Sequence, residues 1–339
     1  MKRFAIFLLA GLLSACSSGD VAEDATMAAR PADPMPSRTF HVRYVAEASK
    51  LPVGRSLRLW IPIPSNDPWQ TIRNLKVTSV EGDFDFRITR EPVHGNRMIY
   101  VDQRVTSPQV TFEINYDVIR HERIENLANL RSDGMPEGEA SIYLQPSKLA
   151  VVDADILMQE KELAGSETDT LKKARRFYDH VLQQMRYGKP EGLAWGRGDT
   201  KYACDARVGN CTDFHSWFIS LCLAAKIPAR FQIGLYGDYE TKPGEEFKTG
   251  GYHCWAEFRV PGKAWVPVDI SEADKDLSRQ DYFFGGHTNN RVTLSTGRDL
   301  VLQPAQAGES LNYFLAPYAE VDGQVHESVS KTSYWTDAL

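Results

Sequence analysis

The sequence predicts an α+β protein in which an N-terminal antiparallel β-sandwich precedes a domain of helices and antiparallel strands. Between residues 39 and 120, apolar and polar residues alternate with a period of two, as in half-buried strands. Between residues 170 and 225, apolar residues instead recur at steps of three or four, as in amphipathic helices. The length of 339 residues fits about two domains at roughly 150 residues each.

The composition is that of a globular chain that can bury a sizeable core. Its residues are 42% hydrophobic and 25% charged, which excludes disordered, collagen-like and polytopic membrane proteins. The formal net charge of −6 provides no basic surface, so we expect neither a nucleic-acid partner nor an acidic polymer as substrate. Five cysteines are too few for a disulfide scaffold.

The first 16 residues have the pattern of an export signal. Lys2 and Arg3 precede an apolar run at residues 4–13, which is too short to span a bilayer as a helix. The run leads into Leu-Ser-Ala-Cys at 13–16, which resembles a bacterial lipobox. This resemblance implies cleavage before Cys16 and lipidation of its sulfur and its new amino group. The alternative is a plain signal peptide followed by a chance cysteine.

The segment after the signal is predicted to be a tether. Residues 17–38 are rich in Ala, Pro, Ser and acidic residues and contain almost nothing to bury. We therefore expect a lipoprotein signal peptide at 1–15, whose removal changes the net charge from −6 to −8, and a lipidated flexible tether at 16–38. Ser17, in place of Asp, resembles the sorting pattern for outer membranes. The expected location is thus a bacterial membrane, with the outer one favoured, where an acyl anchor holds the exported protein facing the periplasm or the exterior.

Residues 39–150 are predicted to form the β-sandwich domain. Turn signals at 51–54, 65–68 and 94–96 separate the alternating runs at short intervals, and about six strands are expected. The clearest alternations are Phe40, Val42 and Tyr44; Leu57, Leu59 and Ile61; Phe84, Phe86 and Ile88; and Val110, Phe112, Ile114, Tyr116 and Val118.

Residues 151–276 are predicted to form the second domain, and residues 277–339 a C-terminal β-rich extension. One amphipathic helix ends near 187–190, and a second begins near Asn210 or Cys211. Strand candidates follow at 230–236, 253–260 and 264–270. The apolar positions of the two helices are Leu171, Ala174, Tyr178, Val181 and Met185, and then Phe214, Trp217, Phe218, Leu221 and Ala225.

Cys211 is the candidate nucleophile. It follows Asn210 at the first turn of the second helix, where the helix dipole and free backbone N–H groups favour the thiolate. His253, which opens a strand candidate, is the candidate acid and base. Asp269, in the next strand candidate, can orient the imidazole by accepting its other N–H, because adjacent antiparallel strands would bring the two side chains together.

The motifs around these residues resemble the core of the bacterial transglutaminase-like superfamily. They are Gly-Asn-Cys-Thr-Asp-Phe-His at 209–215, Ala-Ala-Lys-Ile-Pro-Ala-Arg at 224–230, His-x-Trp-x-Glu at 253–257 and Trp-Val-Pro-Val-Asp at 265–269. The resemblance covers about residues 168–275 and implies a papain-like fold with a catalytic Cys, His and Asp in this chain order. Cys211, His253 and Asp269 take these roles. Lys226, where the family often has Gly, departs from the pattern but touches no catalytic role.

The residues expected to support the site are Asn210, Asp213, His215, Trp255 and Glu257. His215 lies four residues after Cys211 on the same helix face, so it is also the rival base. Side chains alternate along 253–258, so one set lies in the core, and the pattern leaves open which.

Several alternatives stay open. Cys211 could be a small core residue, and Asp269 could merely cap a turn. The second oxyanion donor is unassigned within 195–204, and residues 238–251 form either a mobile flap over the thiol or an ordinary hairpin loop. The candidate ligands of a zinc site are Cys204, Cys211, His215, His253 and Cys254, but no C-x-x-C pair is present, so no metal is expected. The cysteines left for core packing or a disulfide are Cys204, Cys222 and Cys254.

The expected function is cysteine-dependent acyl transfer on amide or peptide bonds through a thioester, in the bacterial envelope. The substrate would be a protein or peptide, including a peptidoglycan stem peptide, and no cofactor follows from the mechanism. Transfer to water would give a peptidase or deamidase and transfer to an amine a transglutaminase; hydrolysis is narrowly favoured because water is always present. The alternative is a catalytically inert lipoprotein whose β-sandwich recruits a partner.

Overall fold

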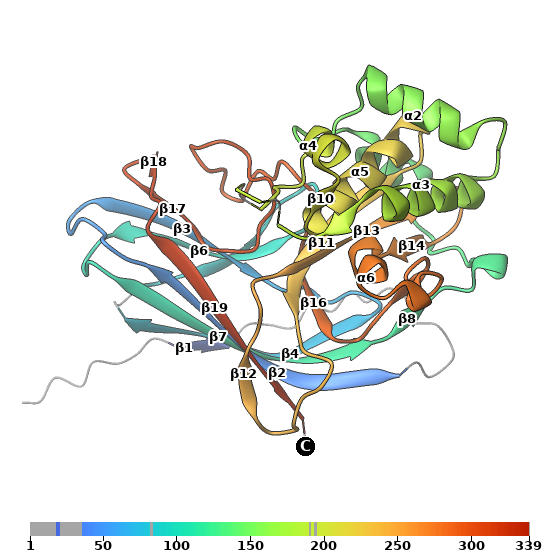
Figure 1. Cartoon of the computed structure of the whole chain (residues 1–339). Coiled ribbons are helices and arrows are strands. Elements are labelled where there is room, and N and C mark those ends of the chain that lie inside the picture. The colour runs from blue at the N-terminus through green and yellow to red at the C-terminus, as the bar shows by residue number, and fades with distance from the viewer. Residues whose placement is uncertain (1–17, 21–35, 82–83, 190, 193–194, 339) are drawn as a thin grey trace, which may run out of the picture.

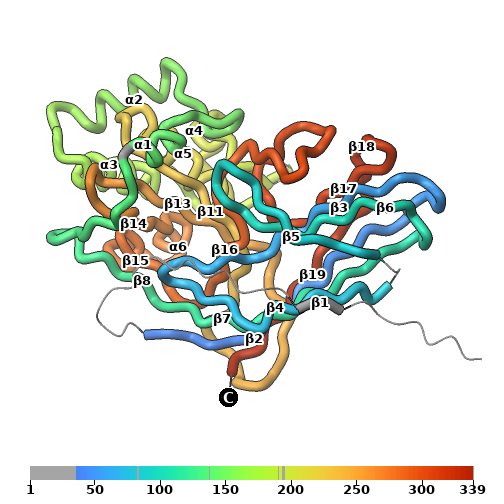
Figure 2. Tube along the Cα trace, turned by 180° about the vertical axis from the view of Figure 1, so that it is seen from behind, coloured from blue at the N-terminus to red at the C-terminus, as the bar shows by residue number. Residues whose placement is uncertain are grey.

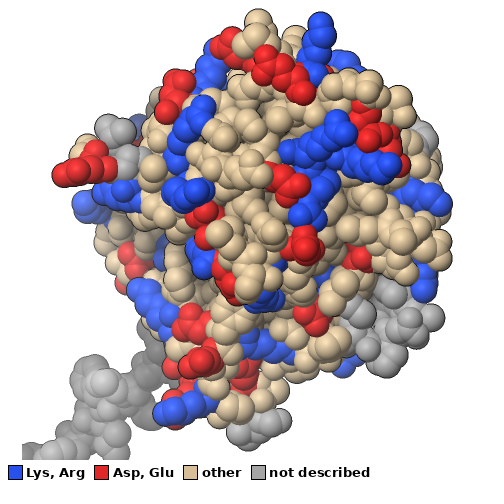
Figure 3. All heavy atoms as spheres, turned by 45° about the vertical axis from the view of Figure 1, so that its right-hand side comes forward, with Lys and Arg blue, Asp and Glu red and all other residues tan. Residues whose placement is uncertain are grey.

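A computed structural model describes residues 18–20, 36–81, 84–189, 191–192 and 195–338. The predicted signal peptide, Cys16, Ser17 and residues 21–35 of the predicted tether lie outside this range. Within it, no helix is long and apolar enough to cross a membrane. On the face shown in Figure 3, basic and acidic side chains are interspersed.

The predicted antiparallel β-sandwich is present (Figures 1 and 2). Its first sheet has the order β1 (Ser18–Asp20), β4 (Gln70–Glu81), β7 (Val110–His121), β2 (Ser37–Ala48), β19 (Val329–Asp337) and β12 (Glu246–Lys248). Its second sheet has the order β18 (Gln324–Val325), β17 (Tyr318–Val321), β3 (Ser56–Ile63), β6 (Arg97–Arg104) and β5 (Arg87–Arg90). Burial alternates strictly along β7, which confirms the predicted period of two; the residues at most 1% exposed are Val110, Phe112, Ile114, Tyr116 and Val118.

Strands from the end of the chain complete both sheets. β19 pairs with β2 along its whole length, from Val329 opposite Ala48 to Asp337 opposite Phe40. β17 pairs with β3 in the second sheet. The predicted C-terminal extension therefore supplies strands to the N-terminal sandwich.

The second unit is a four-stranded antiparallel sheet covered by helices. The sheet has the order β14 (Trp265–Val268), β13 (His253–Arg259), β11 (Ala229–Tyr236) and β16 (Arg291–Thr296). The helices are α2 (Ala154–Ala164), α3 (Thr170–Gln184), α4 (Thr200–Ala206), α5 (Cys211–Ala224) and α6 (Ile270–Lys275). All 14 residues of α5 are buried, because β13 and β11 cover one side of it and α2, α3 and α4 cover others (Figure 1). The smaller elements are β8 (Arg123–Ile124), β9 (Arg186–Tyr187), β10 (Val208–Gly209), β15 (Gly286–His287), α1 (Glu137–Ala140) and the 3-10 turns η1 (Leu127–Asn129), η2 (Ser141–Leu144) and η3 (Leu277–Arg279).

Residues 238–251 do not form a free flap. Their central strand, β12, pairs with β19 at the edge of the first sandwich sheet, with Phe247 opposite Trp335. The backbone of Thr249 also donates a 2.9 Å hydrogen bond to Ser333 O. The segment therefore ties the second unit to the sandwich.

Two amide side chains of the sandwich bind the outer edge of β16. Gln70 Oε1 accepts a hydrogen bond from Thr293 N (2.8 Å), and Gln70 Nε2 donates one to Thr293 O (3.1 Å). Asn96 makes the same pair of bonds with the backbone of Thr296, each 2.8 Å long. These amides satisfy backbone groups that a neighbouring strand would otherwise bind.

We expect Gln70→Ala to lower the free energy of unfolding by about 2 kcal/mol, because it leaves backbone groups of Thr293 without partners. Urea denaturation followed by circular dichroism measures the effect. The matched control is Gln109→Ala, since Gln109 binds Glu81 at an exposed site and its loss should cost less than about 0.5 kcal/mol. Equal effects of the two substitutions would contradict the edge-binding role of Gln70.

Candidate active site

The side chain of Cys211 lies at the first residue of helix α5. Asn210 is the N-cap and accepts a hydrogen bond from Thr212 N (2.9 Å), while Asp213 accepts one from Asn210 N (2.9 Å), completing a capping box. Cys211 is 2% exposed and sits at the positive end of the helix dipole. The predicted helix start is therefore confirmed.

The side chain of Asp213 also binds the loop that contains Gly198, which precedes this helix in the chain. Its Oδ1 accepts a 2.9 Å hydrogen bond from Gly198 N, so that N–H is already used and is not the second oxyanion donor. A Cβ atom added at Gly196 or Gly209 would overlap the Asp213 carboxylate, so both positions require glycine. Burial raises the pKa of Asp213 to about 6, against the lowering effect of its bonds from Asn210 and Gly198.

His253 and Asp269 meet as the strand order predicts. β13 begins at His253, β14 ends just before Asp269, and the two strands pair antiparallel. His253 Nε2 lies 2.9 Å from Asp269 Oδ2, which leaves Nδ1 to face Cys211. Burial by itself would lower the pKa of His253, but the charge and hydrogen bond of Asp269, together with Cys211, raise it to about 9.

Cys211 carries a strongly acidic thiol. Burial by itself would raise its pKa, but hydrogen bonds from Cys254 and His253 and the positive charge of His253 outweigh burial and lower the pKa to about 5. Between about pH 5 and about pH 9, the two side chains therefore form a thiolate–imidazolium pair.

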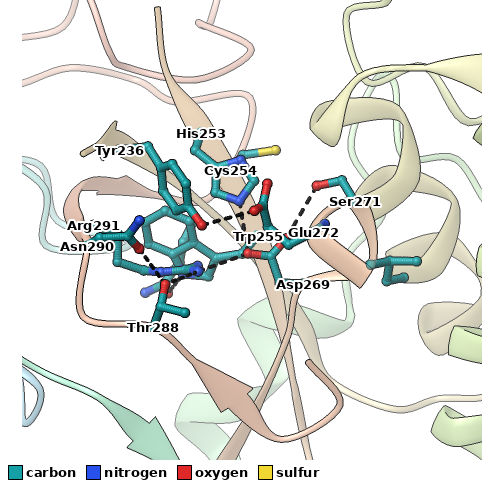
Figure 4. A network of polar contacts seen from close by, with 12 residues as sticks. Tyr236, His253, Cys254, Trp255, Asp269, Ser271, Glu272, Thr288, Asn290 and Arg291 are labelled. Atoms are coloured by element: carbon teal, nitrogen blue, oxygen red, sulfur yellow. Dashed lines mark hydrogen bonds and ion pairs between the residues drawn. The ribbon is translucent and has the colours of Figure 1, made fainter. Parts of the chain in front are cut away.

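Arg291, which from the sequence could either line a cleft or belong to a polar turn, is part of this site. It is 0% exposed, and its Nη2 donates a 3.0 Å hydrogen bond to Asp269 Oδ2, the same oxygen that His253 binds (Figure 4). Its guanidinium lies 4.7 Å from the ring centre of Trp255 and 5.4 Å from that of Tyr236. Burial would raise the pKa of Asp269, but the charges of His253 and Arg291 hold it well below its usual range.

His215 does not occupy the position of the rival base, because its Nε2 is 3.8 Å from Asp269 Oδ1, beyond hydrogen-bond distance, whereas His253 Nε2 binds Asp269 Oδ2. Its Nε2 accepts a hydrogen bond from Ile270 N (3.1 Å), and its Nδ1 lies 3.7 Å from Cys254 Sγ. Burial lowers its pKa to about 4, which keeps the ring neutral. It is a neighbour of the site, as the sequence analysis favoured.

The structure brings Trp255 to the site but not Glu257. Both alternating sets of β13 are buried. Trp255 packs near His253 and Arg291 and donates from Nε1 to Gln232 Oε1 (2.7 Å). Glu257 lies four residues beyond His253, about 13 Å along the strand, and is bound by Arg123 and Arg230. It cannot support the thiol directly.

The four described cysteines are free, with Cys204 half-buried and Cys211, Cys222 and Cys254 buried. Within the described part of the chain, no group of three His, Cys, Asp or Glu side chains is arranged to hold a metal ion. The described residues therefore offer no ligand set for the zinc alternative.

The model of the transglutaminase-like superfamily matches residues 158–270, which run from helix α2 to the start of α6. This segment is a transglutaminase-like domain. An uncharacterized protein of Haemophilus influenzae is 26% identical over 301 residues, which cover 78% of this chain and 80% of that protein.

One solved structure shares the fold of this chain over most of its length. A candidate cysteine protease from Cytophaga hutchinsonii is 15% identical, covers 89% of this chain and 91% of its own, and superposes with a TM-score of 0.59. The periplasmic domain of TgpA from Pseudomonas aeruginosa is 17% identical over 72% of this chain and 92% of its own, with a TM-score of 0.39. At 15% identity, the structure from Cytophaga hutchinsonii shows the fold alone. The TgpA domain superposes too poorly to support the fold further.

We expect iodoacetamide to alkylate Cys211 with a midpoint near pH 5, well below the pKa of about 8.5 of a free cysteine, because the thiolate forms as the pH rises through that value. In His253→Ala, the midpoint should rise by several pH units, since the imidazolium no longer stabilises the thiolate. Mass spectrometry of tryptic peptides measures both. Cys204 is the internal control, because burial raises its pKa to about 11. A Cys211 midpoint like that of free cysteine and indifferent to His253 would refute the ion pair.

Proposed function

We propose that this protein is a cysteine-dependent acyl-transfer enzyme that acts on carboxamide or peptide bonds in the bacterial envelope. The observation that carries the proposal is the series Cys211, His253 and Asp269, in which an acidic thiol faces an imidazole held by a buried carboxylate. The transglutaminase-like fold of residues 158–270 supports the same chemistry.

In the proposed reaction, the Cys211 thiolate attacks the carbonyl carbon, and the negative charge moves to the carbonyl oxygen. The Cys211 backbone N–H, at the start of α5, is a donor for that oxygen. His253 then gives its Nδ1 proton to the departing ammonia or amine as the C–N bond breaks, which leaves a thioester and a neutral imidazole.

The thioester is resolved by a second nucleophile. His253 takes a proton from water or from an amine as that molecule attacks, and it becomes an imidazolium again while the thiolate leaves. Throughout, Asp269 holds the Nε2 side of the ring and Arg291 holds Asp269. We propose hydrolysis, giving a peptidase or deamidase, because water is always available; an amine acceptor would make the protein a transglutaminase. Its substrate is a protein or an envelope peptide.

We also propose that the protein is exported and attached to a bacterial membrane. The charged and apolar pattern of residues 1–13, the lipobox-like residues 13–16 and Ser17 support export and attachment through lipidated Cys16, with the outer membrane favoured. The described part of the chain would then stand beside peptidoglycan and envelope proteins.

We expect a covalent adduct on Cys211 after the protein is incubated with envelope extract, and hydroxylamine should release it because it is a thioester. His253→Ala should slow formation of the adduct by roughly 10³-fold or more. Mass spectrometry of the peptide that contains Cys211 detects the adduct, and its mass identifies the acyl group. The controls are Cys211→Ala, which should carry no adduct, and Cys204→Ser, which should behave as the wild type. Absence of any hydroxylamine-sensitive mass on Cys211 would favour an inert domain.

We expect Cys16→Ala to release the protein from the membrane fraction, because it removes the site of acylation. Fractionation and immunoblotting measure the distribution. The matched variant Ser17→Asp should stay membrane-bound but move from the outer to the inner membrane. Membrane retention of Cys16→Ala would contradict lipid anchoring.

A further inference from the structure

The ring of Tyr236 packs against the proposed acid and base. Tyr236 is the last residue of β11, and its ring centre lies 4.5 Å from that of His253, with the two planes 54° apart (Figure 4). Gly234 pairs with His253 across β11 and β13, so Tyr236, two residues further along, lies on the same face of the sheet. From this diagonal position an aromatic ring can reach the side chain of the opposite strand. Acyl transfer through Cys211, His253 and Asp269 assigns this ring no role.

We propose that Tyr236 is a positioning residue whose aromatic ring holds His253 in its protonated form, and that Glu272 fixes the ring in place. The inference rests on the proposed role of His253 as acid and base. The proton that His253 gives to the leaving group must be on the imidazole before the C–N bond breaks, so a contact that favours the imidazolium favours that step.

The imidazolium of His253 shares its carboxylate with a second cation. His253 Nε2 (2.9 Å) and Arg291 Nη2 (3.0 Å) both bind Asp269 Oδ2, which brings two positive groups together at one oxygen atom. Like charges so close repel each other in a buried site, and the repulsion disfavours protonated His253. The face of an aromatic ring attracts a cation that lies within about 6 Å of its centre. The ring of Tyr236 is 4.5 Å from the imidazole and 5.4 Å from the guanidinium, so it offsets part of the repulsion.

The position of this ring is set by helix α6. The Tyr236 hydroxyl donates to Glu272 Oε2 (3.1 Å), as Figure 4 shows, and Lys275 Nζ donates to the other carboxylate oxygen of Glu272 (2.6 Å). The backbone N–H of Glu272 in turn donates to Asp269 Oδ1 (3.3 Å). Burial raises the pKa of Tyr236 well above its usual value, so the hydroxyl stays protonated and remains a donor. The start of α6 therefore holds both the carboxylate that binds His253 and the ring that packs against it.

The surroundings of His253 contain groups that favour its charge and groups that oppose it. The titratable and charged groups around it are Cys211 and His215 of α5, Asp269 and Glu272 at the start of α6, Arg291 of β16 and Tyr236 of β11. The charges of Asp269 and the Cys211 thiolate favour the imidazolium, whereas burial and the guanidinium oppose it. The Tyr236 ring adds an attraction without a charge of its own, so it stabilises the imidazolium without becoming a competing acceptor for the proton.

The test measures the pKa of His253 by NMR in protein with isotope-labelled histidine, and the signal is assigned through its loss in His253→Ala. Tyr236→Leu, which removes the ring but keeps apolar bulk, should lower the midpoint from about 9 by roughly 0.5–1 pH unit, the equivalent of one cation–π contact. Tyr236→Phe, which keeps the ring, should recover most of the wild-type value. The matched control is Tyr239→Leu, the same substitution at a tyrosine whose hydroxyl lies 2.7 Å from that of Tyr236, which should leave the midpoint unchanged.

The direction of the shift separates this role from loosened packing. If Tyr236→Leu only admitted water, the midpoint would rise, because burial lowers the pKa of His253. A raised or unshifted midpoint in Tyr236→Leu, or an equal fall in Tyr239→Leu, would overturn the inference and leave the proposed acyl transfer in place. A wild-type midpoint near the value of about 6.5 of a free histidine would instead count against the ion pair on which the proposed function depends.

A second variant decides if Tyr236→Leu does not fold, as judged by its melting temperature. Replacement of Tyr236 by trifluorophenylalanine keeps nearly the shape of phenylalanine, but the fluorine atoms withdraw negative charge from the ring face. A His253 midpoint below that of Tyr236→Phe supports the role of the ring, and a midpoint equal to it or above it contradicts that role.

Discussion

The carboxylate of Asp269, which is 0% exposed, is the constraint on which the site depends. A buried charge is tolerated only when it is paired and hydrogen-bonded. Its Oδ2 binds both His253 (2.9 Å) and Arg291 (3.0 Å), and its Oδ1 caps α6 through Glu272 N (3.3 Å). Asp269 lies between β14 and α6 and caps α6. It also orients the imidazole from β13 and pairs with the guanidinium from β16, so this one side chain fixes the relative positions of four elements.

The sandwich is coupled to this carboxylate through β16. Arg291 opens that strand, and its outer edge is bound by Gln70 and Asn96 of the sandwich instead of by another strand. The pairing of β12 with β19 gives a second tie between the two units. Since the charge that holds Asp269 comes from β16, the sandwich contributes to the electrostatics of the site and not only to the size of the fold.

Local features of the chain were predictable and pairings between distant segments were not. The helix start at Cys211 could be predicted because Asn210 and Asp213 have capping residue types at capping spacing, and the meeting of His253 with Asp269 follows from neighbouring antiparallel strands. The pairing of β19 with β2 joins segments almost the whole chain apart, and no local periodicity encodes it. The pairing of Arg291 with Asp269 could not be predicted for the same reason, because it depends on the position of β16 beside β11, which the local sequence does not reveal.

Charge balance explains why the site needs Arg291 in addition to a Cys, His and Asp. In the resting state, Cys211⁻, His253⁺, Asp269⁻ and Arg291⁺ alternate in sign and sum to zero, which limits the cost of burying them. When a thioester forms in the proposed reaction, the thiolate charge and the imidazolium proton disappear together. Asp269 and Arg291 then remain as a neutral pair. Without Arg291, that step would leave an unpaired carboxylate in the core, which would pull the proton back toward His253 and oppose its transfer to the leaving group.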